Sequence, residues 1–134
     1  MHLTVDLRHV VEGELEALQA LYERELAAAA EAFGVKADSE RIWVSPVVEF
    51  DAGCVDALER AARAQGVSYR RMMSGAGHDA VYVSRVAPTA MIFIPCRNGV
   101  SHNEAEYASP EHCALGAQVL CDALLERANQ EESA

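Results

Sequence analysis

The amino-acid sequence predicts an α/β fold, and three observations lead to that prediction. Short runs rich in apolar and β-branched residues alternate with longer segments whose apolar residues recur every three or four positions. One apolar run, residues 90–95 (AMIFIP), is continuous, as in strands that are buried on both faces. The resulting order, β-α-β followed by α-β-α-β-α, is typical of α/β proteins whose helices cross over between strands.

A long helix between two strands is expected at the start of the chain. Residues 2–7 and 41–48 are predicted as short strands, and Pro46 favours an edge or exit position for the second. Residues 12–33 follow a helical pattern, and Gly34 stands where a helix C-cap belongs. The apolar stripe of this helix consists of Leu15, Leu18, Tyr22, Leu26 and Ala29.

Two further helices are predicted from their capping residues. Asp51 can cap a helix that runs to about Ala64, and Ser109 can cap the last helix, whose first position is Pro110. The inward-facing residues are predicted to be Val55, Leu58, Ala61 and Ala62 in the first of these and Leu115, Val119, Leu120 and Leu124 in the second. A polar, frayed tail is expected from Asn129 onward.

Two predicted strands fill the interval between those helices, and each is followed by a segment that can carry function. Residues 69–73 lead into a small-residue turn at 74–79 and a brief helix at 80–86. The buried strand 90–95 leads into a polar loop at 97–108. In open α/β sheets, ligands bind beyond the carboxyl ends of the strands, which is where this loop lies.

Composition excludes several classes of function. The chain has 134 residues, of which 51% are hydrophobic, enough for an ordinary folded domain. Its formal net charge of -10 disfavours binding to nucleic acid, because phosphate backbones repel an acidic protein. No apolar run approaches the roughly 20 residues that span a bilayer, and residues 1–8 lack a signal-peptide pattern.

The four cysteines indicate a reducing compartment. Cys54, Cys96, Cys113 and Cys121 contain no CxxC pair, so their spacing suggests neither a zinc ribbon nor a disulfide scaffold. We expect reduced, mostly buried thiols in a cytoplasmic protein, with Cys96 in a packing role.

Two segments contain residues that could carry chemistry. Residues 74–80 (SGAGHDA) place two glycines directly before His78, and glycine lets a backbone approach a ligand closely because no Cβ intervenes. Residues 95–106 (PCRNGVSHNEAE) place His102 after the buried strand, where it could bind a metal or donate to a ligand. Chemistry alone leaves both histidines open, since a lone loop histidine is more often an ordinary hydrogen-bonding residue and zinc normally takes three or four protein ligands.

The stretch MMSGAGHDAVYVSRVAPTAMIFIPCRNGVSHNEAEYASPEHCALGAQVLCDALL resembles the final segment of a known family. This is the N-carbamoyl-L-amino-acid hydrolase and allantoate amidohydrolase family, within the aminoacylase-type dinuclear metal hydrolases. The signatures SGAGHDA and IPCRNGVSHNE carry the resemblance, and LTVDLRH near the start is similar to a lid-domain strand of that family. The resemblance extends from about Leu3 to Ala128.

The resemblance implies a two-domain metalloenzyme. Residues 1–49 would be the β-α-β half of a lid and dimerisation domain, and residues 50–134 the C-terminal part of a three-layer α/β catalytic domain. Two divalent metals (Zn, Mn, Co or Ni) would generate a hydroxide near neutral pH. The complete enzyme, a homodimer through the lid, would cleave a non-peptide C–N bond of an N-carbamoyl-L-amino acid or, as the second choice, of allantoate.

The same resemblance implies roles for four residues. His102 matches the family's last metal ligand, while Gly77 and His78 match residues that hold the substrate, with His78 stabilising the transition state. Arg8 matches the lid arginine that grips the substrate carboxylate, a task that suits its planar fork.

Ordinary roles are expected for the remaining polar candidates. Glu104 and Glu106 are interpreted as solvated loop residues, and His9 and His112 as surface or capping residues. Arg8 itself could be a surface charge at a strand end.

The family's other metal ligands, its water-activating glutamate and its substrate-binding asparagine match no residue of this sequence. We therefore expect the chain alone to be inactive. Two alternatives stay open: a non-catalytic truncated remnant, or one half of a split enzyme completed by a separately encoded N-terminal half.

The topology also predicts how the site residues are arranged. His78 and His102 are expected near each other at the carboxyl edge of the sheet, because a crossover helix makes their strands parallel. Arg8, in the other domain, is expected far from both.

Overall fold

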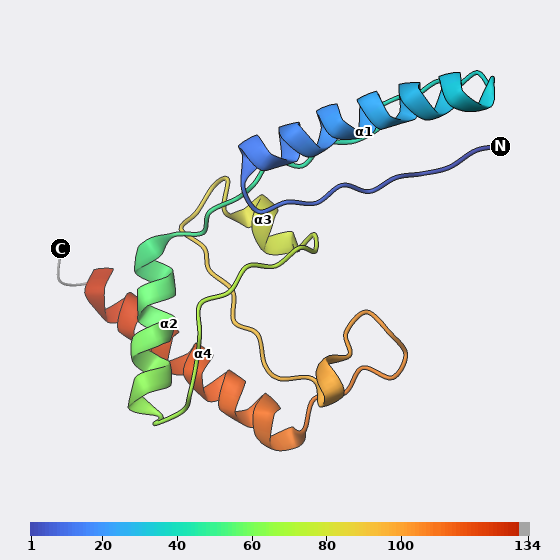
Figure 1. The fold of residues 1–134 in the computed structure, drawn as a ribbon. Helices are drawn as coiled ribbons and strands as arrows, with labels where there is room; N and C mark the ends of the chain where they lie inside the picture. Colours follow the sequence, from blue (N-terminus) through green and yellow to red (C-terminus); the bar gives the residue numbers. More distant parts are fainter. Residues whose placement is uncertain (132–134) are drawn as a thin grey trace. The chain divides into compact units, whose positions relative to one another are not determined.

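The structure is a computed structural model that describes residues 1–131. These residues contain four α-helices and one 3-10 turn (Figure 1), in the order α1 (Glu12–Phe33), α2 (Ala52–Ala64), α3 (Asp79–Val83), η1 (Arg97–Gly99) and α4 (Pro110–Glu131). The chain divides into two compact units. The first contains Met1–Val48 and Met73–Gly77, and the second contains Glu49–Met72 and the chain from His78 onward.

α1 confirms the helix predicted over residues 12–33. Gly34 ends it in the left-handed conformation, with φ of 64°, and its N–H donates to the carbonyl of Glu31 at 3.2 Å. Glycine adopts this conformation without the steric cost that a Cβ imposes.

The first unit is built along α1. The chain after the helix runs back beside it (Figure 1), and Arg41 Nη1 donates to Gln19 Oε1 at 3.0 Å. Of the predicted apolar stripe, Ala29 is exposed and Leu15, Leu18, Tyr22 and Leu26 are only partly buried. No residue of α1 is fully buried, so this unit has a partly covered face in place of a core.

The predicted caps of α2 and α4 are both confirmed. Asp51 Oδ1 accepts the backbone N–H of Cys54 at 2.8 Å, and this bond lowers the pKa of the Asp51 carboxyl. Ser109 Oγ accepts the N–H of His112 at 3.2 Å. Both caps satisfy backbone donors that a helix start otherwise leaves without partners.

Two helix boundaries differ from prediction. α3 is Asp79–Val83, and only turn bonds continue it, such as that from the Val86 N–H to the Val83 carbonyl at 3.0 Å. α4 continues to Glu131, so residues 129–131 are helical and the rest of the expected frayed tail lies outside the described residues. Within residues 1–131, no helix is both long and apolar enough to cross a membrane.

The four predicted strands do not form in residues 1–131. Residues 2–7, 41–48, 69–73 and 90–95 have no regular secondary structure. A strand is held by hydrogen bonds to a neighbouring strand, and none of these segments pairs with another here. The α/β detail of the prediction is therefore not reproduced, although the helices occupy their predicted places.

The core of the second unit lies where α2 packs against α4. These two helices cross (Figure 1), and their buried contact residues are Ala57, Ala61, Ala62, Val119 and Ala123. Four of these five side chains are alanine methyl groups, which allow the two backbones to approach closely. Partly buried Leu58, Val67 and Ile92 close the margin of this core.

The predicted apolar face of α4 needs correction. Val119 is buried and Leu115 partly so, as predicted, whereas Leu120 is 43% exposed and Leu124 is 61% exposed. The buried stripe instead runs through small residues at helical spacing, Gly116, Val119 and Ala123. The alanine surface of α2 explains this, because larger side chains on α4 would hold the helices apart.

The apolar segment 90–95 lies over this core with one face only. Ile92 packs against the core cluster, and Ile94 lies so close to Gly116 that a Cβ there would meet its Cγ2 at 2.5 Å. Phe93, between them, is 45% exposed. The segment keeps the alternation of a strand, but the predicted burial on both faces is wrong for this structure.

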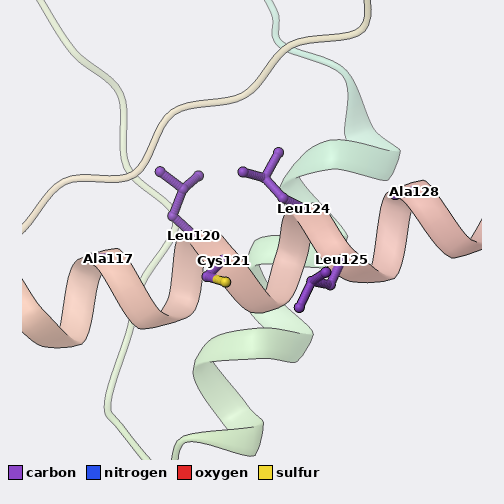
Figure 2. Close-up of a pocket in the computed structure, with 6 residues that line it drawn as sticks. All are labelled: Ala117, Leu120, Cys121, Leu124, Leu125 and Ala128. Carbon is purple, nitrogen blue, oxygen red and sulfur yellow. The ribbon is translucent and has the colours of Figure 1, made fainter.

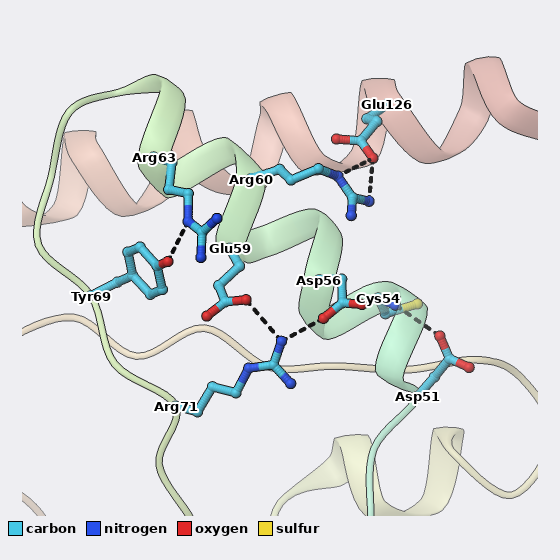
Figure 3. Close-up of polar contacts among 9 residues, drawn as sticks. All are labelled: Asp51, Cys54, Asp56, Glu59, Arg60, Arg63, Tyr69, Arg71 and Glu126. Atoms are coloured by element: carbon cyan, nitrogen blue, oxygen red, sulfur yellow. Dashed lines mark hydrogen bonds and ion pairs between the residues drawn. The ribbon is translucent and has the colours of Figure 1, made fainter.

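Arginine contacts tie the chain after α2 back onto that helix (Figure 3). Arg71 Nη2 donates to Glu59 Oε2 at 2.8 Å and also bonds to Asp56, while Arg63 donates to the hydroxyl of Tyr69. The Arg71 guanidinium lowers the pKa of the Glu59 carboxyl from its ordinary value of 4.5.

Gly116→Ala should destabilise the second unit. Alanine normally improves a helix interior by up to about 1 kcal/mol, but a methyl group forced against the stiff Ile94 side chain should cost about 1–3 kcal/mol. Urea unfolding followed by far-UV circular dichroism measures the difference. Gly13→Ala is the control, because its Cβ would meet nothing within 4 Å. An unchanged or raised stability in Gly116→Ala would show that Ile94 does not seat on this glycine.

Arg71→Gln should raise the pKa of Glu59 toward its ordinary value. Because the carboxyl pKa is lowered in the folded chain, the stabilisation is present above the unfolded-state pKa and is lost as pH falls through the folded-state pKa. The variant should therefore be less stable than the parent at neutral pH and equally stable in acid. NMR titration of the Glu59 carboxyl carbon tests the shift. Arg70→Gln, which removes the neighbouring charge, should leave the Glu59 pKa closer to that of the parent.

Candidate functional site

The glycine turn before α3 is open on its outer side. Ser74 Oγ accepts the N–H of Ala76 at 3.2 Å and shapes the turn. A Cβ added at Gly75 or Gly77 would meet nothing within 4 Å, and neither glycine has a positive φ. Among the described residues, neither packing nor backbone conformation requires glycine at these two positions. Without a Cβ, the backbone there is open to close approach.

His78 follows this turn as the N-cap of α3. Its backbone is extended, with φ of -135° and ψ of 148°, and its carbonyl accepts the N–H of Val81 at 3.0 Å. The half-buried imidazole meets the ring of Phe93 edge to face, with ring centroids 5.6 Å apart. The exposed side of the 90–95 segment therefore supports the histidine that the sequence singled out.

Arg8 contacts the glycine turn directly. Its Nη1 donates to the carbonyl of Gly75 at 2.7 Å, while Nε donates to Asp6 Oδ2 at 3.0 Å. This pairing lowers the pKa of Asp6 and raises that of Arg8. This bond holds Arg8 to the first part of the glycine turn. The predicted separation of Arg8 from His78 and His102 stays a prediction.

The loop that carries His102 is closed at its base by two neighbouring residues. The Arg97 N–H donates to the Tyr107 carbonyl at 2.7 Å, and the Arg97 guanidinium lies 4.8 Å from the centre of the Tyr107 ring. Between them, Asn98, Gly99 and His102 all have positive φ, of 58°, 68° and 53°. This conformation is uncommon outside glycine and marks a tightly folded loop.

Glu106 organises the inside of this loop. Its Oε2 accepts the backbone N–H of His102 at 2.9 Å, and its Oε1 lies 3.8 Å from Cys96 Sγ, a weak hydrogen bond. Glu106 is exposed, in agreement with the solvated role expected for it, but its carboxylate also makes these two contacts. Sequence reasoning missed it because the contact depends on the left-handed turn at His102, for which the sequence carries no signal.

Asp6 was missed for a different reason. It stands two positions before Arg8, and in an extended segment residues at that spacing point to the same side. This spacing in the sequence could have predicted the ion pair between Asp6 and Arg8. Glu104, in contrast, makes none of the contacts found among the described residues and agrees with a solvated role.

The remaining histidines and cysteines take ordinary roles. His9 Nδ1 accepts the N–H of Val11 at 3.1 Å, and His112 takes part in the cap of α4 through its backbone. All four cysteines are free thiols. Cys54 and Cys96 are partly buried, but Cys113 and Cys121 are exposed, so the prediction of mostly buried thiols holds for only two of them.

The residues present do not assemble a metal centre. Across residues 1–131, no group of three or more His, Cys, Asp or Glu side chains lies close enough to hold a metal ion. His102 could supply one ligand, and a complete zinc site takes three or four. The contacts described for His78 and His102 involve different partners, and their predicted proximity stays a prediction.

A shallow apolar hollow of about 480 Å³ lies along α4 (Figure 2). Leu120 and Leu124 project from the same side of the helix, and Cys121 supplies the one polarisable atom of the lining. None of Arg8, His78 and His102 lines it. Apart from the Cys121 thiol, the lining contains no titratable side chain and no cation.

Comparison with known proteins identifies the family. The peptidase family M20/M25/M40 matches residues 7–126. The N-carbamoyl-L-amino-acid amidohydrolase of Rhizobium meliloti is 42% identical over 93% of this chain and 30% of its own length, and the allantoate amidohydrolase of Escherichia coli is 32% identical over 96% of this chain and 31% of its own.

A solved structure agrees with these relatives. The crystal structure of an amidase of the hydantoinase/carbamoylase family from Burkholderia multivorans is 42% identical, with a TM-score of 0.83 over 89% of this chain and 29% of that one. The chain thus spans about 30% of the length of the relatives it matches. Members of the family are generally metal-dependent hydrolases. A match over most of its length shows that this chain belongs to the peptidase family M20/M25/M40.

Proposed function

We propose that this chain supplies part of the active site of a metal-dependent amidohydrolase that cleaves the non-peptide C–N bond of N-carbamoyl-L-amino acids. The observation that carries the proposal is the 42% identity with the Rhizobium meliloti enzyme across 93% of the chain. The contact between Arg8 and the glycine turn supports it, because it sets a carboxylate-binding cation beside a backbone that a ligand can approach.

His102 is proposed as one metal ligand. The other ligands and the glutamate that takes a proton from water would come from outside the described residues, so this chain would contribute to the metal site without completing it. Which of Zn, Mn, Co or Ni is bound, and the number of two per site, are part of the proposal. The metal would supply a nucleophilic water at neutral pH.

Gly77 and His78 are proposed to act on the substrate. Addition of water to the carbamoyl carbon places negative charge on its oxygen before the C–N bond breaks and the leaving nitrogen takes a proton. An imidazole N–H of His78, steadied by Phe93, would donate to that oxygen, and the open Gly77 backbone would let the substrate come close.

Arg8 is proposed to bind the substrate carboxylate through its guanidinium fork. Asp6 occupies two of its N–H groups, Nε and Nη2, which both bond to Oδ2. The side chain is 62% exposed, so a substrate carboxylate can reach it and replace Asp6.

The lid role of residues 1–49, a homodimer through that lid and a cytoplasmic location belong to the same proposal. Support for pairing comes from large apolar side chains that the first unit exposes, such as Ile42, Trp43 and Val44. The boundary near residue 50 and the catalytic role of residues 50–134 are likewise proposed.

Two further candidates follow from specific observations. Allantoate is the second substrate, supported by the Escherichia coli relative at 32% identity. The third reading is a protein that is inactive by itself, either a truncated remnant or one half of a split enzyme. Two observations support this reading. His102 is the one residue that matches a metal ligand of the family, and the described residues assemble no metal site.

A chimera tests the proposal. The matched segment of the Rhizobium meliloti relative is replaced by this chain, and release of free amino acid from N-carbamoyl-L-amino acids is compared with ammonia release from allantoate. We expect hydrolysis of the first substrate by the chimera and none by the purified 134-residue chain with added divalent metals.

His102→Ala in the chimera should lower bound metal and remove activity, and His78→Ala should lower kcat by about 10²–10³-fold with metal retained. Glu104→Ala is the control, with little expected effect. Full metal content in the His102→Ala chimera, or turnover by the purified chain alone, would contradict the assignment.

Asp6→Asn should lower KM for the carboxylate substrate in the same chimera by about two- to fivefold, because it removes an exposed competitor for the Arg8 fork. Asp38→Asn removes an equal charge, paired with Lys36, and should leave KM unchanged. A raised KM in Asp6→Asn would show instead that Asp6 holds Arg8 in its binding position.

A further inference from the structure

The backbone of His102 is held in a conformation that costs free energy for a residue with a Cβ. The φ of His102 is 53°, in the left-handed region. The other candidate histidine, His78, has an ordinary extended backbone. Histidine tolerates this region better than most residues, yet local strain persists only where surrounding contacts compensate for it.

One side chain supplies that compensation. Glu106 Oε2 accepts the His102 N–H at 2.9 Å, a charge-assisted bond, and Oε1 faces Cys96 Sγ at 3.8 Å. A single carboxylate thus connects the residue before η1 with the histidine in the middle of the loop.

The position of Glu106 is itself fixed. Its N–H donates to the Asn103 carbonyl at 2.9 Å, and the next residue, Tyr107, accepts the Arg97 N–H at 2.7 Å. Asn103 Oδ1 also accepts the N–H of Ala105 at 2.9 Å. The backbone that bears this carboxylate is therefore part of a short, closed turn.

We propose that Glu106 is the positioning residue of His102: its carboxylate holds the histidine backbone in the left-handed conformation and so sets the direction in which the imidazole leaves the loop. The functional meaning rests on the proposed role of His102 in metal binding. The structural claim stands independently of that role, and so does its test.

The test uses isotope-labelled 134-residue chain and three substitutions. Glu106→Ala removes both acceptors, Glu106→Gln keeps one oxygen acceptor for the His102 N–H, and Glu104→Ala removes an equal charge two positions away. Two quantities are measured for His102: the hydrogen-exchange rate of its amide and the three-bond coupling that reports φ.

In Glu106→Ala, the His102 amide should exchange about tenfold faster, the loss expected for one net hydrogen bond, and its coupling should move away from the left-handed value. Glu106→Gln should stay close to the parent, and Glu104→Ala should match it. Core amides of α2 and α4 should be unchanged in all three.

The proposal is overturned if Glu106→Ala matches Glu104→Ala at His102, or if Glu106→Gln changes His102 as much as Glu106→Ala does. If Glu106→Ala fails to fold, the Gln variant decides, because a positioning role requires its His102 signals to be native. An inactive or metal-free chimera would contradict the proposed function while leaving these measurements, and this inference, intact.

Discussion

Close packing of α2 against α4 is the constraint on which the second unit depends. Among the described residues, these are the only two helices that pack on each other, and their buried contact residues are four alanines and Val119. Gly116 leaves room for Ile94, which fixes the path of the 90–95 segment, and that segment offers Phe93 to His78. The contact between Phe93 and His78 therefore depends on Gly116, because the missing Cβ at that position lets Ile94 seat on α4.

Helices and their caps were predictable because the relevant interactions are local. Asp51, Ser109 and Gly34 act on backbone groups within a few residues of themselves, so a single sequence contains the whole signal. Strands are different, because their hydrogen bonds need a neighbour that the pattern cannot supply. The continuous apolar run in residues 90–95 predicted burial on both faces, but whether both faces are covered is decided by other parts of a fold of which this chain spans about 30%.

The candidate site divides along the same line. Arg8, His78 and His102 stand in motifs, so the sequence alone makes them candidates, whereas the contact of Glu106 depends on a turn that brings residues four apart together. The predicted apolar face of α4 was also too wide. Helical periodicity places Leu120 and Leu124 near the buried face, but both are exposed because the alanine surface of α2 packs only against small residues there. Periodicity predicts which side of a helix faces the core, but the surface of the partner helix decides how many residues on that side are buried.

The sequence separation of the two core helices has a kinetic consequence. α2 ends at Ala64 and α4 begins at Pro110, so the core forms only after the intervening chain has closed into a loop. The entropic cost of closing a loop rises by about 0.6 kcal/mol for each doubling of its length. In the described residues, no other pair of helices makes contacts that could offset this cost before α2 and α4 meet. High contact order of this kind slows folding. The alanine interface is therefore expected to be among the last features to form, and until it does, both of its helices expose apolar residues to other molecules.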